Sequence, residues 1–172
     1  MTDKEKVYRT DKLTFLSYGL LIVAYALFIA VIVKRAGGFS SSMLILFLFV
    51  LPVLAYFFFL FKKSVKITDE GIEIFGLTGK KKIRWEEIAS VSLTPGRKYF
   101  LFIESKDGKL AVVDDSTENF VEVAREVKRR APVKLPENYD KLLDSYRRSY
   151  TSIGILLFAA LVLIFVAVKS LI

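Results

Sequence analysis

Apolar and polar residues follow two different patterns along this chain. In the first pattern apolar residues run together almost without charge, over the stretches Leu13–Val33, Met43–Phe61 and Ile153–Val168. A helix needs about 20 apolar residues to cross a hydrocarbon layer of about 30 Å. The pattern therefore predicts three transmembrane helices, at about residues 13–33, 43–61 and 150–170.

The third stretch is the shortest of the three. It reaches spanning length when Tyr150–Ser152 and Ser170–Ile172 extend it and Lys169 snorkels toward the lipid headgroups. A helix buried in a soluble core is the alternative for a run of this length. The first stretch is longer than a signal-peptide core of about 7–15 residues and is followed by Lys34-Arg35, so we expect it to be retained.

In the second pattern, found between the second and third stretches, apolar and polar residues alternate, which is typical of strands. Six short strands separated by turns are predicted, at about residues 64–68, 72–77, 81–85, 88–93, 98–104 and 109–113. An amphipathic helix follows, because apolar residues recur at helical spacing from Phe120 to Val127 and Pro132 ends the pattern. Asp115–Glu118 is the predicted N-terminal cap of this helix.

Another helical pattern precedes the third apolar stretch. After an extended linker at Ala131–Glu137, apolar residues recur at helical spacing from Tyr139. We predict one long helix from Tyr139 into the membrane, with Tyr146 and Tyr150 at the interface. The predicted organisation is an N-terminal segment and transmembrane hairpin, then a soluble domain, then a linker with juxtamembrane and third transmembrane helices, at residues 1–61, 62–131 and 132–172.

Composition narrows the chemistry that the chain can perform. It is 53% hydrophobic and 26% charged, and it contains no histidine and no cysteine. The commonest general base, the commonest metal ligand and the thiol nucleophile are therefore missing. We expect a non-enzymatic protein without a cofactor or a metal site. The positive excess of the soluble segment is small for a nucleic-acid surface, so we expect no nucleic-acid partner.

Basic residues near the apolar stretches predict the topology. They gather before the first stretch, after the second and before the third, at Lys4, Lys6, Arg9, Lys12, Lys62, Lys63, Lys66, Arg147 and Arg148. The loop between the first two stretches carries only Lys34 and Arg35, and the C-terminal tip only Lys169. The positive-inside rule then predicts a multi-pass plasma-membrane protein whose N-terminus and soluble domain are cytoplasmic and whose C-terminus is external.

Two motifs carry a resemblance to a known family. Thr68–Ile72 reads Thr-Asp-Glu-Gly-Ile, and Ile83–Val91 reads Ile-Arg-Trp-Glu-Glu-Ile-Ala-Ser-Val. Together they resemble the pleckstrin-homology-like (PH-like) domains of small bacterial and archaeal membrane proteins, over about Lys62–Ala131. The resemblance implies an antiparallel β-barrel or bent sheet, inserted between transmembrane helices and capped by one C-terminal amphipathic helix. It also implies that Trp85 and Ile88 belong to the structural core.

Phe102 lies in the most apolar predicted strand, so we count it as a core residue as well. The full fold that the resemblance implies has seven strands, whereas the pattern predicts six. A seventh strand near Lys134 or before Ser64 would complete it; otherwise the barrel is open.

Clustered cations are the candidate site. Lys80, Lys82 and Arg84 share one face of a predicted strand, since successive side chains alternate. The complete predicted lipid-facing patch is Lys62, Lys63, Lys80, Lys82, Arg84, Arg97 and Lys98. Anionic headgroups attract such cations by about 1 kcal/mol each. The alternative is a set of solvated turns that only obey the positive-inside rule.

These observations predict a membrane-anchored interaction or scaffold module that binds a protein partner, including another membrane subunit, through its cytoplasmic PH-like domain. One alternative is a protein that binds or senses anionic lipid. Another is an accessory subunit of a transporter or membrane enzyme whose chemistry lies in a different chain. The pattern leaves the oligomeric state open.

Overall fold

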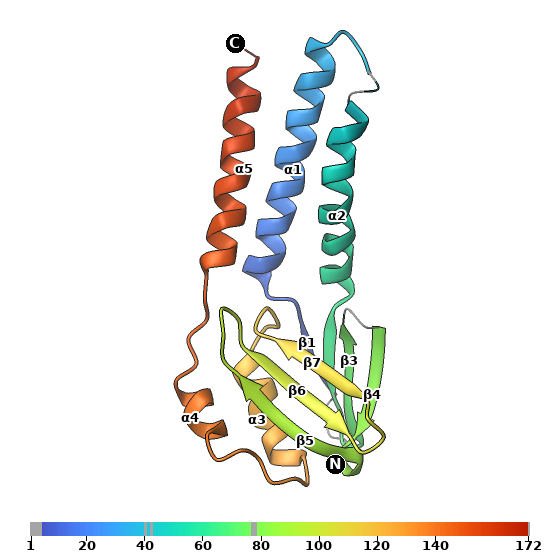
Figure 1. Ribbon diagram of the computed structural model, residues 1–172, viewed down its shortest axis with the longest axis vertical. Helices are drawn as coiled ribbons and strands as arrows, with labels where there is room; N and C mark the ends of the chain where they lie inside the picture. Colours follow the sequence, from blue (N-terminus) through green and yellow to red (C-terminus); the bar gives the residue numbers. More distant parts are fainter. Residues whose placement is uncertain (1–4, 40, 42, 77–78, 172) are drawn as a thin grey trace. The chain divides into compact units, whose positions relative to one another are not determined.

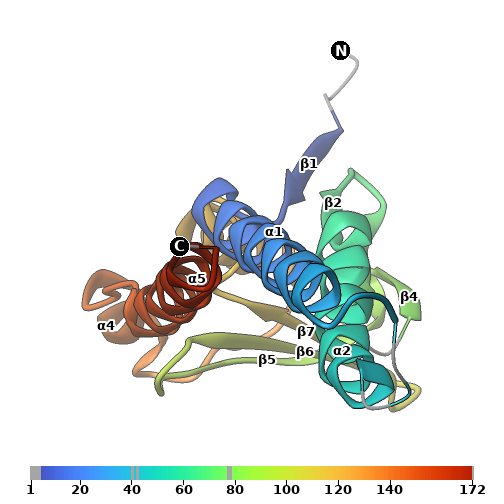
Figure 2. The same ribbon diagram turned by 90° about the horizontal axis from the view of Figure 1, so that it is seen from above.

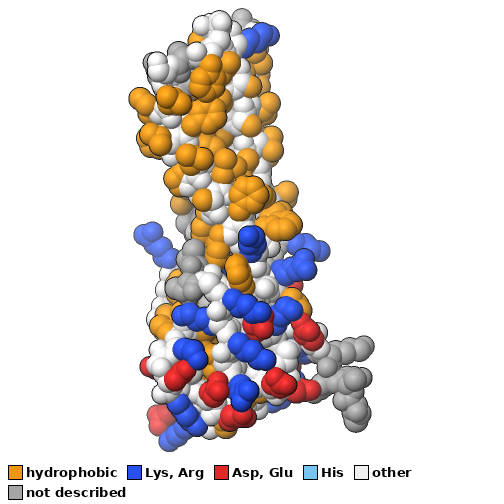
Figure 3. All heavy atoms as spheres, turned by 90° about the vertical axis from the view of Figure 1, so that its right-hand side faces the viewer, with side chains coloured by type: hydrophobic (Ala, Val, Ile, Leu, Met, Phe, Trp, Pro, Cys, Tyr) orange, Lys and Arg blue, Asp and Glu red, His pale blue; other side chains and the backbone are white. Residues whose placement is uncertain are grey.

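A computed structural model describes residues 5–39, 41, 43–76 and 79–171 (Figure 1). The chain divides into two compact units. The sheet unit comprises Met1–Asp11 and Lys62–Ser149, and the helical unit comprises Lys12–Phe61 and Tyr150–Ile172. Apolar side chains cover the helical unit, whereas most Lys, Arg, Asp and Glu side chains lie on the sheet unit (Figure 3). This segregation explains how a strongly apolar chain carries so many charges.

The helical unit confirms the three predicted apolar helices. They are α1 (Lys12–Arg35), α2 (Met43–Lys62) and α5 (Thr151–Lys169). Among the described residues these three helices are long and apolar enough to cross a membrane. Gly37 and Gly38 both adopt positive φ in the short connection after α1, which reverses the chain as predicted.

Helix α1 lies between α5 and α2, as the view in Figure 2 shows. Small residues allow close packing with α5, because Ala24 and Ala160 are both completely buried. Aromatic pairs connect α1 with α2: the ring centroids of Phe15 and Phe57 lie 4.7 Å apart. Most large apolar side chains of these helices remain exposed, which is the pattern expected of helices that face lipid.

The described strands of the sheet unit form two antiparallel sheets instead of one closed barrel. The first has the order β1-β2-β3-β4, with β1 (Lys6–Arg9), β2 (Ser64–Ile67), β3 (Gly71–Gly76) and β4 (Gly79–Arg84). After the 3₁₀ turn η1 (Trp85–Glu87), the second has the order β5-β6-β7, with β5 (Ile88–Thr94), β6 (Phe100–Ser105) and β7 (Leu110–Asp114). The bent-sheet form of the expected fold is therefore the observed one. Leu77 and Thr78, where the second predicted strand ends, lie outside the described residues.

The seventh strand precedes the first apolar helix. Strand β1 pairs with β2 from Lys6 opposite Ile67 to Arg9 opposite Ser64, and it buries Tyr8 against the core. The predicted domain boundary at residue 62 was therefore wrong, because β1 also belongs to the sheet unit. A four-residue strand with one buried side chain gives no periodic signal that could be recognised before the partner strand is known.

The core of the sheet unit lies between the sheets and α3 (Phe120–Arg130). Trp85 and Ile88 belong to it, with 8% and 0% exposure. Phe102 does not: Leu101 and Ile103 point inward and are fully buried, so Phe102 faces the outer side of β6. It is half-buried and lies beside Phe100, with 6.1 Å between ring centroids. A strand buried on one face can carry apolar residues on both faces, and that misled the prediction.

Two helix boundaries also differ from the prediction. Helix α3 begins at Phe120, after Asn119 in the left-handed conformation, so Asp115–Thr117 forms a buried loop and not a cap. The predicted long helix from Tyr139 is interrupted: α4 (Tyr139–Asp144) ends well before α5, and the intervening segment is not helical. Tyr146 packs in the sheet unit instead of reaching an interface belt.

The interruption between α4 and α5 is explained by the packing of aromatic side chains. The Tyr139 hydroxyl donates to the carbonyl oxygen of Ala124 on α3, at 2.9 Å. The ring of Tyr146 lies 5.0 Å from Tyr99 and 5.5 Å from Phe120, measured between centroids. Burying these rings against the sheet unit stabilises it more than continuing an isolated helix would.

Candidate functional site at the tether end

The chain leaves the sheet unit at three points, after Asp11, before Lys62 and after Ser149. Two observations bring these points to one end of the unit. Arg9 pairs with Ser64 at the same end of β1 and β2, and Asp11 forms an ion pair with Arg148 at 2.7 Å. We call this end the tether end. The opposite end, where β2 turns into β3, is called the far end (Figure 1).

One loop organises the tether end. This tether loop, Asp114–Thr117, begins at the last residue of β7 and is largely buried. The carbonyl oxygen of Ser116 accepts a hydrogen bond from the Asp11 amide at 2.8 Å, and its hydroxyl accepts one from Lys63 at 2.7 Å. Lys63 also forms an ion pair with Asp114. The tether loop therefore binds two of the three connections directly, and the third through the Asp11–Arg148 pair.

The ion pair between Lys63 and Asp114 corrects one part of the predicted patch. Lys63 is only 7% exposed, so it does not face lipid; its ammonium group binds the tether loop. Burial alone would raise the pKa of Asp114, but the neighbouring Lys63 ammonium and Ser116 hydroxyl lower it below its ordinary value. The sequence cannot distinguish a buried lysine such as Lys63 from the exposed lysines beside it, because its partner Asp114 lies 51 residues away along the chain.

A hairpin is fixed to the same loop. It connects β5 with β6 and carries Arg97 and Lys98. The Tyr99 amide donates to the Asp115 carboxylate at 3.2 Å, and the Asp115 amide donates to the Tyr99 carbonyl oxygen at 3.1 Å. Burial raises the pKa of Asp115, and the Tyr99 amide opposes that rise. The hairpin thus holds Arg97 exposed and Lys98 half-exposed at the tether end.

The cations of β4 do not form a continuous surface with that hairpin. Lys80, Lys82 and Arg84 share the exposed face of β4, as predicted. However, β4 runs from the tether end toward the far end, so Lys80 and Arg84 lie about 13 Å apart along the strand. Two of them are paired: Lys80 with Glu73 at 2.7 Å, and Lys82 with Glu70 at 3.3 Å.

The remaining exposed cations of the tether end are different. Within the described part of the chain none of them forms a salt bridge, and they are Arg9, Lys62, Arg97, Lys98 and Arg147. Four are exposed and Lys98 is half-exposed. Asp114 binds Lys63 and Asp11 binds Arg148, while the carboxylates of Asp115 and Glu118 accept hydrogen bonds from the Tyr99 and Arg9 amides. The five cations outnumber these two remaining carboxylates, so the tether end carries an excess of positive charge.

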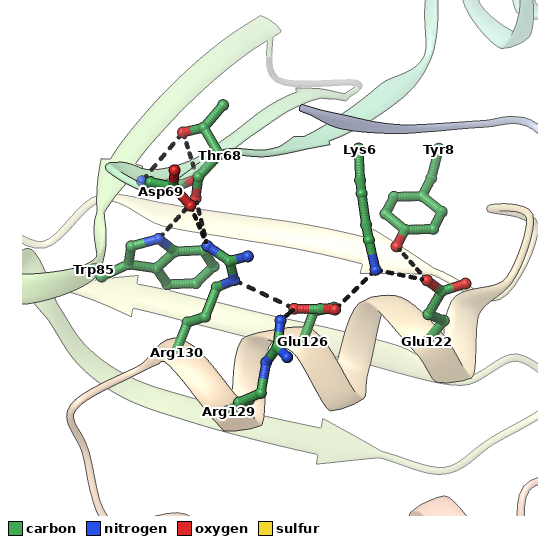
Figure 4. A network of polar contacts seen from close by, with 10 residues as sticks. Lys6, Tyr8, Thr68, Asp69, Trp85, Glu122, Glu126, Arg129 and Arg130 are labelled. Atoms are coloured by element: carbon green, nitrogen blue, oxygen red, sulfur yellow. Dashed lines mark hydrogen bonds and ion pairs between the residues drawn. The ribbon is translucent and has the colours of Figure 1, made fainter. Parts of the chain in front are cut away.

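At the far end charged side chains form a continuous network instead (Figure 4). Glu126 on α3 accepts hydrogen bonds from Lys6 of β1, at 2.9 Å, and from Arg129 and Arg130. Burial disfavours the charged form of Glu126, but these three donors outweigh it and lower its pKa to about 2. Lys6 also binds Glu122, which accepts a hydrogen bond from the Tyr8 hydroxyl.

The same network closes the turn between β2 and β3. Trp85 donates from its indole nitrogen to the Thr68 carbonyl oxygen at 3.0 Å, and Arg130 donates to the same oxygen at 3.2 Å. Arg130 also pairs with Asp69 at 3.0 Å, and its guanidinium carbon lies 5.9 Å from the centroid of Trp85 (Figure 4). Sequence reasoning found Trp85 but missed Lys6 and Glu126, because their partners come from distant segments.

A hollow of about 360 Å³ lies beside this network. Its lining mixes acidic and basic residues, which are Glu5, Ile67, Thr68, Asp69, Glu70, Lys82 and Arg130. Most of its charges are already used in ion pairs, so the hollow offers little uncompensated charge to a ligand. Among the described residues no three acidic side chains are grouped so that they could hold a metal ion.

An apolar patch marks the outer face of the second sheet. It consists of Phe100 and Phe102 on β6 and Leu110 and Val112 on β7. Phe102 lies directly opposite Val112, and Leu110 and Val112 are 44% and 37% exposed. We call these four residues the outer patch. Contiguous apolar surface of this kind commonly marks a contact surface.

Comparison with known proteins agrees with this architecture. A family model described as bacterial PH domain matches residues 5–140. The match begins just before β1 and ends inside α4, so it includes all seven described strands and α3. Searches of curated proteins and of solved structures found no significant match. Because the family model covers most of the chain, this protein belongs to the bacterial PH domain family.

Proposed function

We propose that this chain is a non-enzymatic, membrane-anchored interaction module that binds a protein partner through the outer patch. Its family supports the general part of the proposal, since PH domains are modules for protein or lipid interaction. The absence of histidine and cysteine supports a role without catalysis. An accessory subunit of a larger membrane complex is one form that such a module takes.

The outer patch is the observation that carries the proposal. The inner faces of β6 and β7 already fill the core with Leu101, Ile103 and Val113, so the outer patch adds nothing to that core. Aromatic side chains are enriched where proteins bind one another, because they bury much area with few rotatable bonds. Polar side chains of Ser90, Ser92 and Thr94 on β5 border the patch, as a rim borders an interface.

Capture of a partner in its native membrane tests this proposal. A photo-crosslinking amino acid at Phe102 should produce a defined heteromeric product from the full-length protein, and the same group at Arg125 on exposed α3 should not. Co-purification of that partner after mild detergent extraction should fall at least about tenfold in Phe102→Ser, which corresponds to about 1.4 kcal/mol. Equal capture from both positions, or an unchanged yield in Phe102→Ser, would contradict the proposal.

The proposed orientation places the sheet unit in the cytoplasm and the C-terminus outside. The cations before α1, after α2 and before α5 support it through the positive-inside rule. Because the chain has no cysteine, single cysteines can be introduced cleanly at exposed Ser41 and Arg125. In intact cells an impermeant thiol reagent should label Ser41→Cys and not Arg125→Cys. Labelling of Arg125→Cys but not of Ser41→Cys would show that the orientation is the opposite of the proposed one.

A further inference from the structure

One tyrosine lies near the middle of the apolar helix α1. Tyr25 is about 20 Å along the helix from Lys12 and about 15 Å from Arg35, at about 1.5 Å per residue. Tyrosines of membrane helices gather at the interfaces, where the hydroxyl reaches water or headgroups. The hydroxyl of Tyr25 forms no hydrogen bond with any residue that the structure describes. In a bilayer, helix α1 therefore carries an unpaired hydroxyl at a depth where lipid offers only hydrocarbon.

Helix α2 carries a backbone carbonyl without its usual donor. Pro52 lies inside this helix and has no amide hydrogen, so the carbonyl oxygen of Leu48 lacks its helical partner. Leu48 is about 20 Å along the helix from Lys62. Because α2 returns antiparallel to α1 (Figure 1), this is the depth of Tyr25. The side chain of Leu48 is 65% exposed, so this part of α2 faces out of the helical unit.

A hollow lies between α1 and α2 at the same depth. It measures about 170 Å³, and its lining residues are Tyr25, Phe28, Ile29, Leu46 and Phe49. All of them come from α1 and α2, while α5 packs elsewhere on α1 through Ala160 (Figure 2). The hairpin therefore presents a donor, an acceptor and an unfilled apolar hollow together at mid-span.

We propose that this face of the hairpin binds the same face of a second copy of the chain, side by side in the bilayer. The Tyr25 hydroxyl of each copy donates to the Leu48 carbonyl oxygen of the other. The exposed Leu48 side chain fills the facing hollow. This contact is separate from the proposed protein contact through the outer patch, and it relies only on insertion of the apolar helices in a bilayer.

Symmetry favours a second copy over any other occupant. Copies inserted in the same way are parallel, so a two-fold axis along the bilayer normal brings equal depths together. Each copy then supplies the acceptor for the other's Tyr25 and the donor for the other's Leu48. An acyl chain can fill the hollow but offers no polar group. Association of helices in lipid depends on close packing and interhelical hydrogen bonds, because lipid tails are as apolar as the side chains.

Energy transfer between full-length copies in liposomes tests the proposal. Because the chain has no cysteine, one dye attaches at exposed Ser41→Cys, and the ratio of protein to lipid is varied. Tyr25→Phe removes only the hydroxyl and should raise the dissociation constant of the dimer about tenfold, since two hydrogen bonds are lost. Pro52→Ala gives Leu48 its helical donor and should have a similar effect. The double variant should also lose about tenfold, because either change removes the same bonds.

Matched variants separate this contact from a general effect on the helices. Tyr18→Phe removes a hydroxyl whose ring packs on Tyr56 inside the hairpin, and it should change the dissociation constant less than about twofold. Oxidation in membranes should crosslink Phe49→Cys, beside the hollow, and not Phe158→Cys, which is 69% exposed on α5.

Three results would overturn the proposal. They are monomers at every ratio of protein to lipid, multiplied losses in the double variant, and equal crosslinking at the two cysteine positions. A loss in Tyr18→Phe as large as that in Tyr25→Phe would do the same, because the depth of the hydroxyl would then not matter. None of these results bears on partner capture through Phe102.

Discussion

The two ends of the sheet unit are both held by charged side chains, but they differ in how many partners each charge has. At the far end Glu126 binds three cations, Lys6 binds two carboxylates, and Arg130 binds Glu126, Asp69 and the Thr68 carbonyl oxygen. At the tether end Lys63 binds only the tether loop, through Asp114 and Ser116. Arg148 pairs with Asp11, and Arg9, Lys62, Arg97, Lys98 and Arg147 form no salt bridge with a described residue.

The difference separates two uses of charge within one small domain. At the far end a redundant network joins the turn between β2 and β3 to the end of α3. Most of its charged groups are paired with one another, so few are available to a ligand. At the tether end two separate pairs, Lys63 with Asp114 and Arg148 with Asp11, fix the connections to the helices, and the exposed cations around them form no salt bridge. Counting charges along the sequence would treat both ends alike, whereas pairing distinguishes them.

The largest loss of stability is expected on changing Trp85, which lies in the core and binds the turn at the far end. Trp85→Ala should lower the free energy of unfolding of the sheet unit by about 3–5 kcal/mol. Phe102→Ala removes an aromatic ring of the outer patch and should cost about 1 kcal/mol or less. Urea unfolding of full-length protein in detergent, followed by hydrogen exchange of the strands, measures both. Similar losses in the two variants would mean that the core is assigned wrongly.

The next effect tests the buried pair of the tether end. Lys63→Met leaves Asp114 without its cation, and it should cost about 2–4 kcal/mol because Asp114 is largely buried. Lys63→Met combined with Asp114→Leu should recover much of that loss, since neither charge then lacks a partner. The same unfolding measurement gives the coupling between the two residues. Additive losses would show that the pair does not hold the connections.

A smaller effect is expected from the redundant network. Glu126→Gln should cost about 1–2 kcal/mol, because Lys6 retains Glu122 and Arg130 retains Asp69. The pKa of Glu126, at about 2, lies below that of an unfolded glutamate. Its contribution is therefore complete at neutral pH and is lost as the pH falls from about 4.5 toward 2. Stability of Glu126→Gln should fall less steeply over that pH range; parallel curves would exclude Glu126 as the cause.

The smallest loss of stability is expected on removing an exposed ion pair. Lys82 and Glu70 form a pair with side-chain exposures of 55% and 74%, so Lys82→Ser should change stability by less than about 0.5 kcal/mol. This variant is the reference for the three above, measured in the same way. A loss as large as that of Lys63→Met would remove the distinction between the two ends.

Much of the fold could be predicted because its signals are local. Three apolar runs identified the helices, alternation identified six strands, and the motif around Trp85 and Ile88 identified the family. Other features had no local signal. Strand β1 is recognisable only through its partner β2, and Phe102 differs from Leu101 only in the side of β6 on which it lies. The topology and the partner remain predictions.

In the candidate site, too, some features have a local signal in the sequence and others depend on the fold. The sequence by itself determined where apolar and charged residues gather, because hydrophobic period and charge are properties of single residues and their neighbours. Only the tertiary structure decided which cations are free. It buried Lys63 against Asp114, paired Lys82 with Glu70, and left Arg97 exposed. Whether a charge is available depends on burial and on partners brought together from distant segments, and that is settled when the chain folds.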